Sequence, residues 1–397
     1  MSSEAASGSA CRPSWNPLKC GGTDLPANLT ILVKTLAIVL LMTNHVRLLP
    51  DPWLSFIPAI DLIPAAPFQR TLQTVFVLAA VAIVFNRRIR FFSLVLGSTM
   101  LLAVVSSKAY YGNNKTFCGL MFLLSGLYKP GGYPFLRWQL AITYFGAGLN
   151  KLLDGDWHTG VFFENWAVHR LHQPWYIALD DWLPPLVLAK FMCWTTILTE
   201  LGIVPFLLLP RLYPWAIVLN ILFQASLLLF TGTTFTLFFY SMTAASLAFV
   251  HWPETALSVT YRPDRPLGRW ACAFLQPWDF DRRFTFLPLP PAAGEEEPRL
   301  PSPVTLQFSL GDRIYSNFRA VRMIVLLNPV TYFVLAGAIA ACEAAPLAAL
   351  LRRIIVTASL ALLLPPLAWI ADTLSGSGDL RPAQMAPPPA SDQMTEA

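Results

Sequence analysis

The chain has 397 residues, of which 55% are hydrophobic and only 13% are charged, and its formal net charge is +5. Soluble domains carry about a quarter charged residues, so this composition predicts a polytopic membrane protein. The net charge is too small to favour a nucleic-acid-binding protein. The six cysteines contain no C-x-x-C pair that would predict a zinc site or a dithiol redox centre.

Apolar stretches alternate with polar turns along most of the chain, and they predict an all-α membrane bundle. Several stretches are shorter than the ~20 residues of a perpendicular span, and we expect eight or nine crossings. These eight or nine crossings are expected among ten apolar stretches: Leu29–Met42, Leu72–Phe85, Phe91–Ser107, Phe117–Leu127, Phe135–Leu149, Leu186–Leu209, Trp215–Thr231, Thr234–Phe249, Met323–Ala341 and Ile354–Ile370.

The composition divides the chain into five parts. We expect a disordered tail at 1–27, a transmembrane domain at 28–252, a Pro-rich cytoplasmic loop at 253–320, a transmembrane hairpin at 321–372 and a disordered tail at 373–397. The first tail lacks the features of a cleavable signal peptide, and its cysteines, Cys11 and Cys20, are expected to be free unless an oxidising compartment pairs them. Within the loop, Thr305–Phe308 is expected to form one short strand.

The basic cluster Arg87–Arg90, in a short loop, predicts which side of the membrane is cytoplasmic. By this rule the N-terminus is cytoplasmic. The expected location of the chain is a bacterial inner membrane or an equivalent cell membrane. Lys151 then lies near the outer mouth of its helix. The segment from Asp156 to Trp175 is expected to form one amphipathic helix along the outer surface.

Two charged residues interrupt apolar segments and are the first functional candidates. Lys151 either snorkels to water or lines a protein cavity, where a desolvated amine could act as a base. Glu200 lies in the middle of an apolar span, and Lys151 or Lys190 could be its partner. A pair with Lys151 would favour a structural role over base catalysis.

Histidines are concentrated after Lys151 and raise the question of a metal site. His158, His169 and His172 lie close to Glu164, and the last two histidines have the i, i+3 spacing of one helix face. Histidines in an interfacial segment more often face lipid headgroups, so we expect no metal.

The stretch from Tyr144 to Gly160, YFGAGLNKLLDGDWHTG, with the VFFENW that follows, resembles the central motif of the vitamin K-dependent gamma-carboxylases. It is similar also to the wider horizontally transferred transmembrane domain family, across about residues 28 to 252. The matching positions are Tyr144, Phe145, Gly148, Lys151, Asp156, Trp157, Gly160 and Glu164. The resemblance implies that Lys151 is the base that deprotonates a reduced quinone such as vitamin K hydroquinone.

Two family histidines are replaced in this chain. The pair Asn113–Asn114 is followed by Lys115, and Phe223 is followed by Gln224. The large lumenal β-rich region of the animal enzymes has no counterpart either. The resemblance therefore implies catalytic positions at Lys151, Lys115 and Glu200, and cofactor-binding positions at Tyr144, Asn114, Gln224 and Trp157, without predicting glutamate carboxylation.

The leading hypothesis is a carboxylase-like or quinol-epoxidase-like membrane enzyme of the lyase class, acting on a quinone or another lipid-soluble molecule. A non-catalytic lipid- or quinone-binding protein is the alternative. A transporter is a third possibility that no inverted repeat supports. The lipid bilayer is the expected partner, and no nucleic acid is. Residues 311–329 are similar to the end of a thiol-disulfide oxidoreductase-like domain sometimes fused to this family, but no redox cysteines accompany them.

Overall fold

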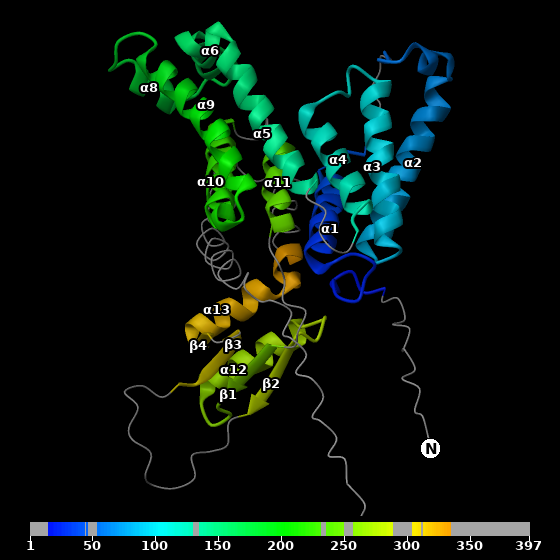
Figure 1. Ribbon diagram of the computed structural model, residues 1–397, viewed down its shortest axis with the longest axis vertical. Coiled ribbons are helices and arrows are strands. Elements are labelled where there is room, and N and C mark those ends of the chain that lie inside the picture. Colours follow the sequence, from blue (N-terminus) through cyan, green and yellow to red (C-terminus); the bar gives the residue numbers. More distant parts are fainter. Residues whose placement is uncertain are drawn as a thin grey trace, which may run out of the picture.

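The computed structural model describes residues 15–43, 45–46, 54–129, 135–231, 236–249, 257–288, 304–310 and 313–334. A helical bundle forms one end of this structure and a small sheet domain the other, with a cap of short helices at the far end of the bundle (Figure 1).

The bundle is built from apolar helices. They are α1 (Ala27–Met42), α2 (Ala65–Val84), α3 (Ile89–Ser106), α4 (Asn113–Gly126), α5 (Phe135–Leu153), α9 (Val187–Leu208), α10 (Tyr213–Thr231) and α11 (Thr236–Ala245). Among the described residues, four helical segments are long and apolar enough to cross a membrane: 65–84, 89–106, 187–208 and 210–231. Two shorter apolar helices, 27–42 and 237–248, accompany them. The membrane bundle is thus present, and the number of eight or nine crossings stays a prediction.

A buried lysine holds the N-terminal segment against the bundle. Lys34 of α1 is fully buried, and its Nζ donates to the carbonyls of Pro17 and Lys19 and to Asn86 Oδ1. Asn86 lies in the tight α2–α3 turn with φ of 59°, a left-handed conformation that asparagine tolerates better than most residues. Residues 15–26 are therefore packed, contrary to the expectation of a disordered tail.

The segment after Lys151 folds as several short helices, so the prediction of one amphipathic helix is wrong. They are α6 (Gly155–Thr159), α7 (Val161–Glu164), a π-helical turn (Asn165–Arg170) and α8 (Pro174–Asp180). The break comes at Gly160, whose φ of 88° is in the left-handed region that favours glycine. A Cβ at this position would lie 2.7 Å from the backbone nitrogen of Lys190, so a larger residue does not fit there. Buried side chains of this cap, including Trp157, Phe163 and Tyr176, pack against α9 and Phe230.

The region expected to be a Pro-rich loop contains a sheet, and the all-α prediction is therefore incomplete. The elements of this sheet domain are β1 (Leu257–Tyr261), α12 (Pro266–Leu275), η6 (Gln276–Trp278), β2 (Phe284–Pro288), β3 (Leu306–Leu310), β4 (Arg313–Ser316) and α13 (Phe318–Leu327). The strand order is β2-β1-β3-β4, with β1 parallel to β2 and the other two pairs antiparallel. The expected strand at Thr305–Phe308 corresponds to β3.

One face of the sheet is apolar and buried, and the other is mostly polar, with Leu287 and Ile314 as exposed apolar residues. Leu257 and Val259 of β1 and Phe308 of β3 are buried, while the alternate positions Ser258 and Gln307 are partly exposed. This period-two pattern is typical of a sheet covered on one side, here by α12 and α13.

The sheet domain has a βαβ unit followed by a hairpin and a helix. A C-x-x-C pair near a βαβ unit is typical of thiol redox domains. In this chain α12 begins with Pro266, Leu267 and Gly268, and the described part of the domain has one cysteine, Cys272, which is buried. The similarity of residues 311–329 to the end of a thiol-disulfide oxidoreductase-like domain stays a prediction.

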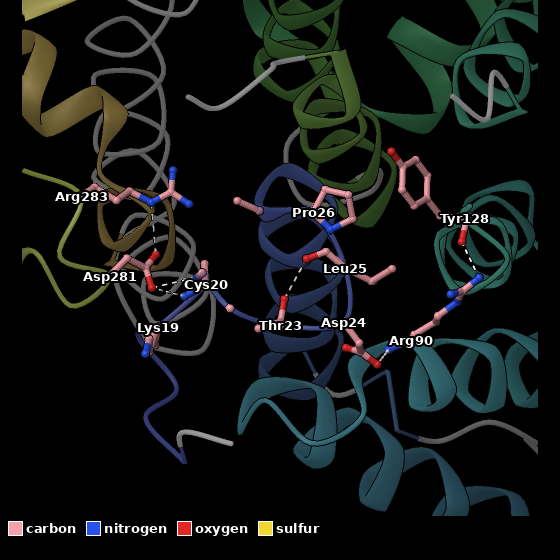
Figure 2. Close-up of a pocket in the computed structure, with 13 residues that line it drawn as sticks. Lys19, Cys20, Thr23, Asp24, Leu25, Pro26, Arg90, Tyr128, Asp281 and Arg283 are labelled. Atoms are coloured by element: carbon pink, nitrogen blue, oxygen red, sulfur yellow. Dashed lines mark hydrogen bonds and ion pairs between the residues drawn. The ribbon is translucent and has the colours of Figure 1, made fainter. Parts of the chain in front are cut away.

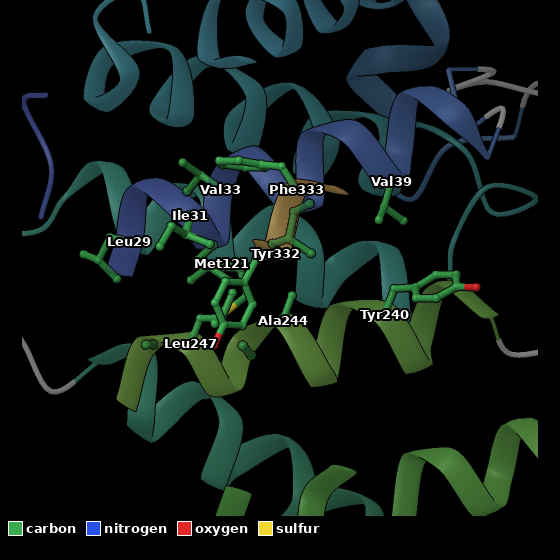
Figure 3. Packing of buried hydrophobic residues seen from close by; sticks show 14 of the residues in the cluster. Leu29, Ile31, Val33, Val39, Met121, Tyr240, Ala244, Leu247, Tyr332 and Phe333 are labelled. Carbon is green, nitrogen blue, oxygen red and sulfur yellow. The ribbon is translucent and has the colours of Figure 1, made fainter. Parts of the chain in front are cut away.

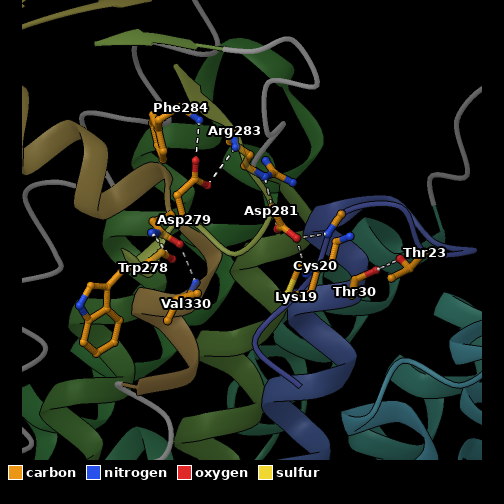
Figure 4. A network of polar contacts seen from close by, with 12 residues as sticks. Lys19, Cys20, Thr23, Thr30, Trp278, Asp279, Asp281, Arg283, Phe284 and Val330 are labelled. Carbon is orange, nitrogen blue, oxygen red and sulfur yellow. Dashed lines mark hydrogen bonds and ion pairs between the residues drawn. The ribbon is translucent and has the colours of Figure 1, made fainter. Parts of the chain in front are cut away.

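Two contacts attach the sheet domain to the bundle. Asp281 Oδ1 accepts hydrogen bonds from the backbone nitrogens of Cys20 and Gly21 at 2.9 and 2.8 Å (Figure 4). After α13, Tyr332 and Phe333 pack among the buried residues of α1 and α11 (Figure 3). The expected span Met323–Ala341 does not begin as predicted, because α13 ends at Leu327 and packs on the sheet. The rest of the expected hairpin at 321–372, beyond residue 334, and the tail at 373–397 lie outside the described residues.

Candidate functional site

Lys151 and Glu200 form an ion pair between α5 and α9. Lys151 lies in the last turn of α5, and its Nζ is 2.8 Å from Glu200 Oε1 and 2.6 Å from Oε2. The two side chains are 19% and 7% exposed, respectively. The same ammonium lies 5.1 Å from the centre of the Trp157 ring, which is within the range of a cation–π contact. The lysine is thus enclosed by protein groups and does not snorkel freely to water.

A glycine allows the two helices to approach closely at this pair. A Cβ at Gly148 would lie 2.8 Å from the Leu201 side chain and 3.3 Å from the Cβ of Glu200. Gly148 is one turn before Lys151 and one turn after Tyr144, so these three positions share one face of α5. All three positions belong to the family motif that the sequence resembles. The close contact with Leu201 explains why position 148 is a glycine.

Tyr144 belongs to a buried polar network that lies about two helical turns before Lys151 along α5. Its hydroxyl donates to Asn220 Oδ1 and accepts from Gln224 Nε2 at 2.8 Å. Asn220 Nδ2 donates to the Met242 carbonyl and to Ser246 Oγ at 2.9 and 2.7 Å. The amide oxygen of Gln224 is buried and has no hydrogen-bond partner among the described residues. In a membrane bundle such polar groups are costly unless they are paired, which makes this network a candidate functional position.

Asn220 and Ser246 were missed by sequence reasoning. Neither carries a charge, and neither is part of the family motif. The available signal was an asparagine inside the apolar run of Ile217 to Leu222, since an amide among apolar side chains needs a partner.

Asn114 and Lys115 lie in a separate place, at the start of α4. Lys115 Nζ donates to the Tyr110 carbonyl at 2.8 Å and lies 3.8 Å from the centre of the Tyr110 ring. Asn114 Oδ1 accepts from the Lys115 backbone nitrogen at 2.9 Å. His45, which follows α1, has a pKa that is lowered to about 4. Burial is the main cause, and the positive charge of Lys115 contributes to the lowering.

The predicted residues therefore fall into three groups. Lys151, Glu200 and Trp157 meet at one point, Tyr144 and Gln224 meet at another, and Asn114 with Lys115 forms the third. The contacts of Lys115 among the described residues include neither Lys151 nor Glu200. Lys190, the alternative partner of Glu200, is exposed on α9.

Of the three histidines in the cap, His158 is engaged in other contacts, and His169 and His172 are exposed. The His158 ring stacks on Trp194 at 5.5 Å between ring centres, and its Nε2 lies 2.5 Å from the Leu152 carbonyl oxygen. Glu164 accepts a hydrogen bond from the Tyr176 hydroxyl at 2.6 Å. Burial, together with the Glu164 carboxylate, raises the pKa of Tyr176. Within the described ranges no group of three or more His, Cys, Asp or Glu side chains could hold a metal ion.

A separate pocket of about 660 Å³ lies at the other end of the bundle, beside the sheet domain (Figure 2). The N-terminal segment lines it, together with Arg90, Tyr128, Asp281 and Arg283. None of the residues predicted for the site lines this pocket. The pocket results from the docking of the sheet domain and is distinct from the ion pair.

Residues 132–252 match the family model of the HTTM domain. The chain contains an HTTM domain. The matched range includes the ion pair, Trp157 and the Tyr144 network, and it excludes Asn114 and Lys115. The HTTM domain thus contains the two groups of site residues that lie along α5. No curated protein and no solved structure matches the chain.

Proposed function

We propose that the HTTM domain binds a quinone or a similar lipid-soluble molecule along the polar face of α5, and that Lys151 exchanges a proton with it. The observation that carries this proposal is the enclosed Lys151–Glu200 pair, at 2.6 and 2.8 Å. Such a pair by itself favours a structural role, so base chemistry requires that Glu200 first takes the proton of the lysine. The pair lies between the Trp157 ring and the Tyr144 network, so aromatic and polar groups are both within reach of an amphipathic ring.

The ion pair defines how the lysine could act as a base. The Lys151 ammonium first passes a proton to the Glu200 carboxylate, which leaves a neutral amine beside a neutral acid. Exclusion of water by a bound apolar molecule favours this neutral form. The amine then takes the proton of a quinol hydroxyl, so that a quinolate forms next to a new ammonium. The Tyr144 hydroxyl and the Gln224 amide would orient the polar end of the ring.

Glutamate carboxylation is not part of this proposal. Carboxylation needs a carbanion to be formed and trapped by carbon dioxide, and the enzyme has to stabilise the negative charge that develops on the way. Lys115, in place of a family histidine, is engaged with Tyr110, and Gln224 cannot change its protonation state. These two substitutions support proton exchange without the carbon–carbon bond.

The test uses the full chain in lipid nanodiscs with a reduced menaquinone analogue. Binding is measured by equilibrium dialysis without oxygen, and conversion of the quinol is followed by chromatography after oxygen is admitted. We expect binding and conversion by the wild type, and binding without conversion by Lys151→Ala. Absence of binding by the wild type would refute the proposal.

The alternative is a binding protein without catalysis, which the enclosed ion pair also supports, because such a pair can be purely structural. In that case the wild type and Lys151→Ala both bind the quinol and neither converts it. A parallel assay with labelled bicarbonate and a glutamyl peptide tests carboxylation. Incorporation of label that Lys151→Ala abolishes would show that the two substituted positions do not prevent it.

A further inference from the structure

Helix α12 of the sheet domain has two apolar faces. Ala271, Cys272 and Leu275 are buried on the inner face. On the outer face, Trp270 and Phe274 of α12 and Trp278 of the following η6 are 58%, 47% and 40% exposed. A helix that covers a sheet in water normally has a polar outer face. The three outer aromatic residues, called the aromatic stripe below, need another explanation.

The aromatic stripe is a continuous surface. Its members are spaced by four residues, and each ring contacts the next: Trp270 and Phe274 are stacked, and Phe274 and Trp278 are tilted to one another. The ring centres of Trp270 and Phe274 are 5.4 Å apart with an interplanar angle of 4°, and those of Phe274 and Trp278 are 6.0 Å apart at 34°. A clustered apolar surface of this kind marks an interaction site more often than isolated exposed residues do.

The stripe is tied to the membrane bundle at one end. Asn328 Nδ2 donates to the backbone carbonyl of Trp278 at 2.9 Å. Four and five residues after Asn328, Tyr332 and Phe333 are buried against α1 (Figure 3). Figure 4 shows Trp278 beside Val330, on the side of the sheet domain that meets the bundle. The stripe thus starts next to the apolar helices of the bundle.

Charge also favours a lipid surface. Residues 257–288 contain five arginines and three aspartates, and Arg265 and Arg269, near Trp270, are exposed. The same end of the bundle carries Arg87 and Arg90, which the positive-inside rule assigns to the cytoplasmic leaflet. That leaflet is anionic, and it attracts arginine beside the membrane. Tryptophan and phenylalanine are the side chains typical of the headgroup region.

We propose that the aromatic stripe lies in the headgroup region of the cytoplasmic leaflet, in the same bilayer that the bundle spans, with Arg269 against anionic phospholipid. The sheet domain is then held at the membrane by three attachments: the stripe, the Asp281 contacts and the Tyr332–Phe333 segment. This inference concerns a surface outside the HTTM domain and does not depend on the proposed function.

The test places the photoreactive residue benzoylphenylalanine at position 270 or 274 of the full chain, in nanodiscs that contain phosphatidylglycerol. Leu78, 62% exposed on α2, is the lipid-facing reference, and Asp264, exposed at the start of the same domain, is the control. Protection of the buried Cys272 from maleimide shows that α12 remains packed in each variant.

After irradiation, adducts are identified by mass spectrometry. We expect phospholipid adducts at positions 270 and 274, as at 78, and their absence at 264. Adducts to a second copy or to another protein at 270 and 274, or no lipid adduct there while position 78 is labelled, would overturn the proposal.

Discussion

Asp281 and Cys20 join two parts of the chain that are 261 residues apart, since the aspartate carboxylate accepts the Cys20 backbone N–H at 2.9 Å. The N-terminal segment is thereby placed between α1 and the sheet domain. The thiol of Cys20 is fully buried there, and burial raises its pKa to about 12. The junction is therefore a fixed part of the structure whose integrity a thiol reagent can report.

We predict that Asp281→Ala makes Cys20 reactive. In the wild type, at pH 7.5, the raised pKa and the burial leave almost no accessible thiolate, and maleimide should not modify this residue. Loss of the carboxylate removes the acceptor for two backbone N–H groups and loosens the junction. Labelling is measured on the Cys20 peptide by mass spectrometry. Asp264→Ala, on an exposed residue, is the control, and equal labelling in the two variants would contradict the prediction.

Gly148 should be far more sensitive to substitution than its neighbour Gly146. A Cβ at 148 meets Leu201 at 2.8 Å, whereas a Cβ at 146 has nothing within 4 Å. Gly148→Ala is expected to destabilise the bundle by about 1–3 kcal/mol through overpacking. Gly146→Ala should be neutral or stabilising, because alanine favours a helix over glycine. Thermal unfolding in detergent measures both, and similar shifts in the two variants would show that the α5–α9 contact is looser than described.

Local patterns in the sequence were sufficient to predict the bundle helices, and they gave Lys151 and Lys190 as the two candidate partners of Glu200. Long apolar runs specify a membrane helix wherever it packs, and a charge inside such a run needs a partner, which is why Glu200 could be connected with Lys151. The prediction of Lys151 and Glu200 rests on the free-energy cost of a single charged side chain in an apolar membrane segment. That cost is evident from the neighbouring residues in the sequence alone.

The sheet domain could not be predicted in the same way. Its strands have five residues or fewer, and β1 pairs with β3 across more than 40 positions, so no local period identifies them. The junction of Cys20 with Asp281 and the separate location of Lys115 depend equally on contacts between distant segments. The cap was mispredicted because the backbone reverses at Gly160 within an otherwise amphipathic pattern.

His45 should make the stability of the protein depend on pH. Its pKa in the folded chain is about 4, lowered by burial and by Lys115, and the unfolded value is about 6.5. The unfolded chain therefore binds the proton more readily, and stability is lost as the pH falls from about 6.5 to about 4. His45→Gln should flatten the pH dependence of Tm over that range, while His169→Gln, at an exposed position, should not. An unchanged slope in the first variant would exclude His45 as the cause.

The last prediction separates the structural role of the Lys151–Glu200 pair from its chemical role. Lys151→Met or Glu200→Gln alone leaves a polar or charged group without its partner among buried residues, and each should cost about 3 kcal/mol. The double variant should recover much of that loss, because neither charge remains. Lys190→Met, on the exposed side of α9, should stay within about 0.5 kcal/mol of the wild type.

Unfolding of these four variants and conversion of the quinol are measured in the same nanodiscs. If the pair exchanges protons, the double variant is stable yet converts no quinol, so stability and turnover separate. If the double variant is as unstable as either single variant, the ion pair does not couple the two residues, and the assignment of Lys151 and Glu200 as one unit fails.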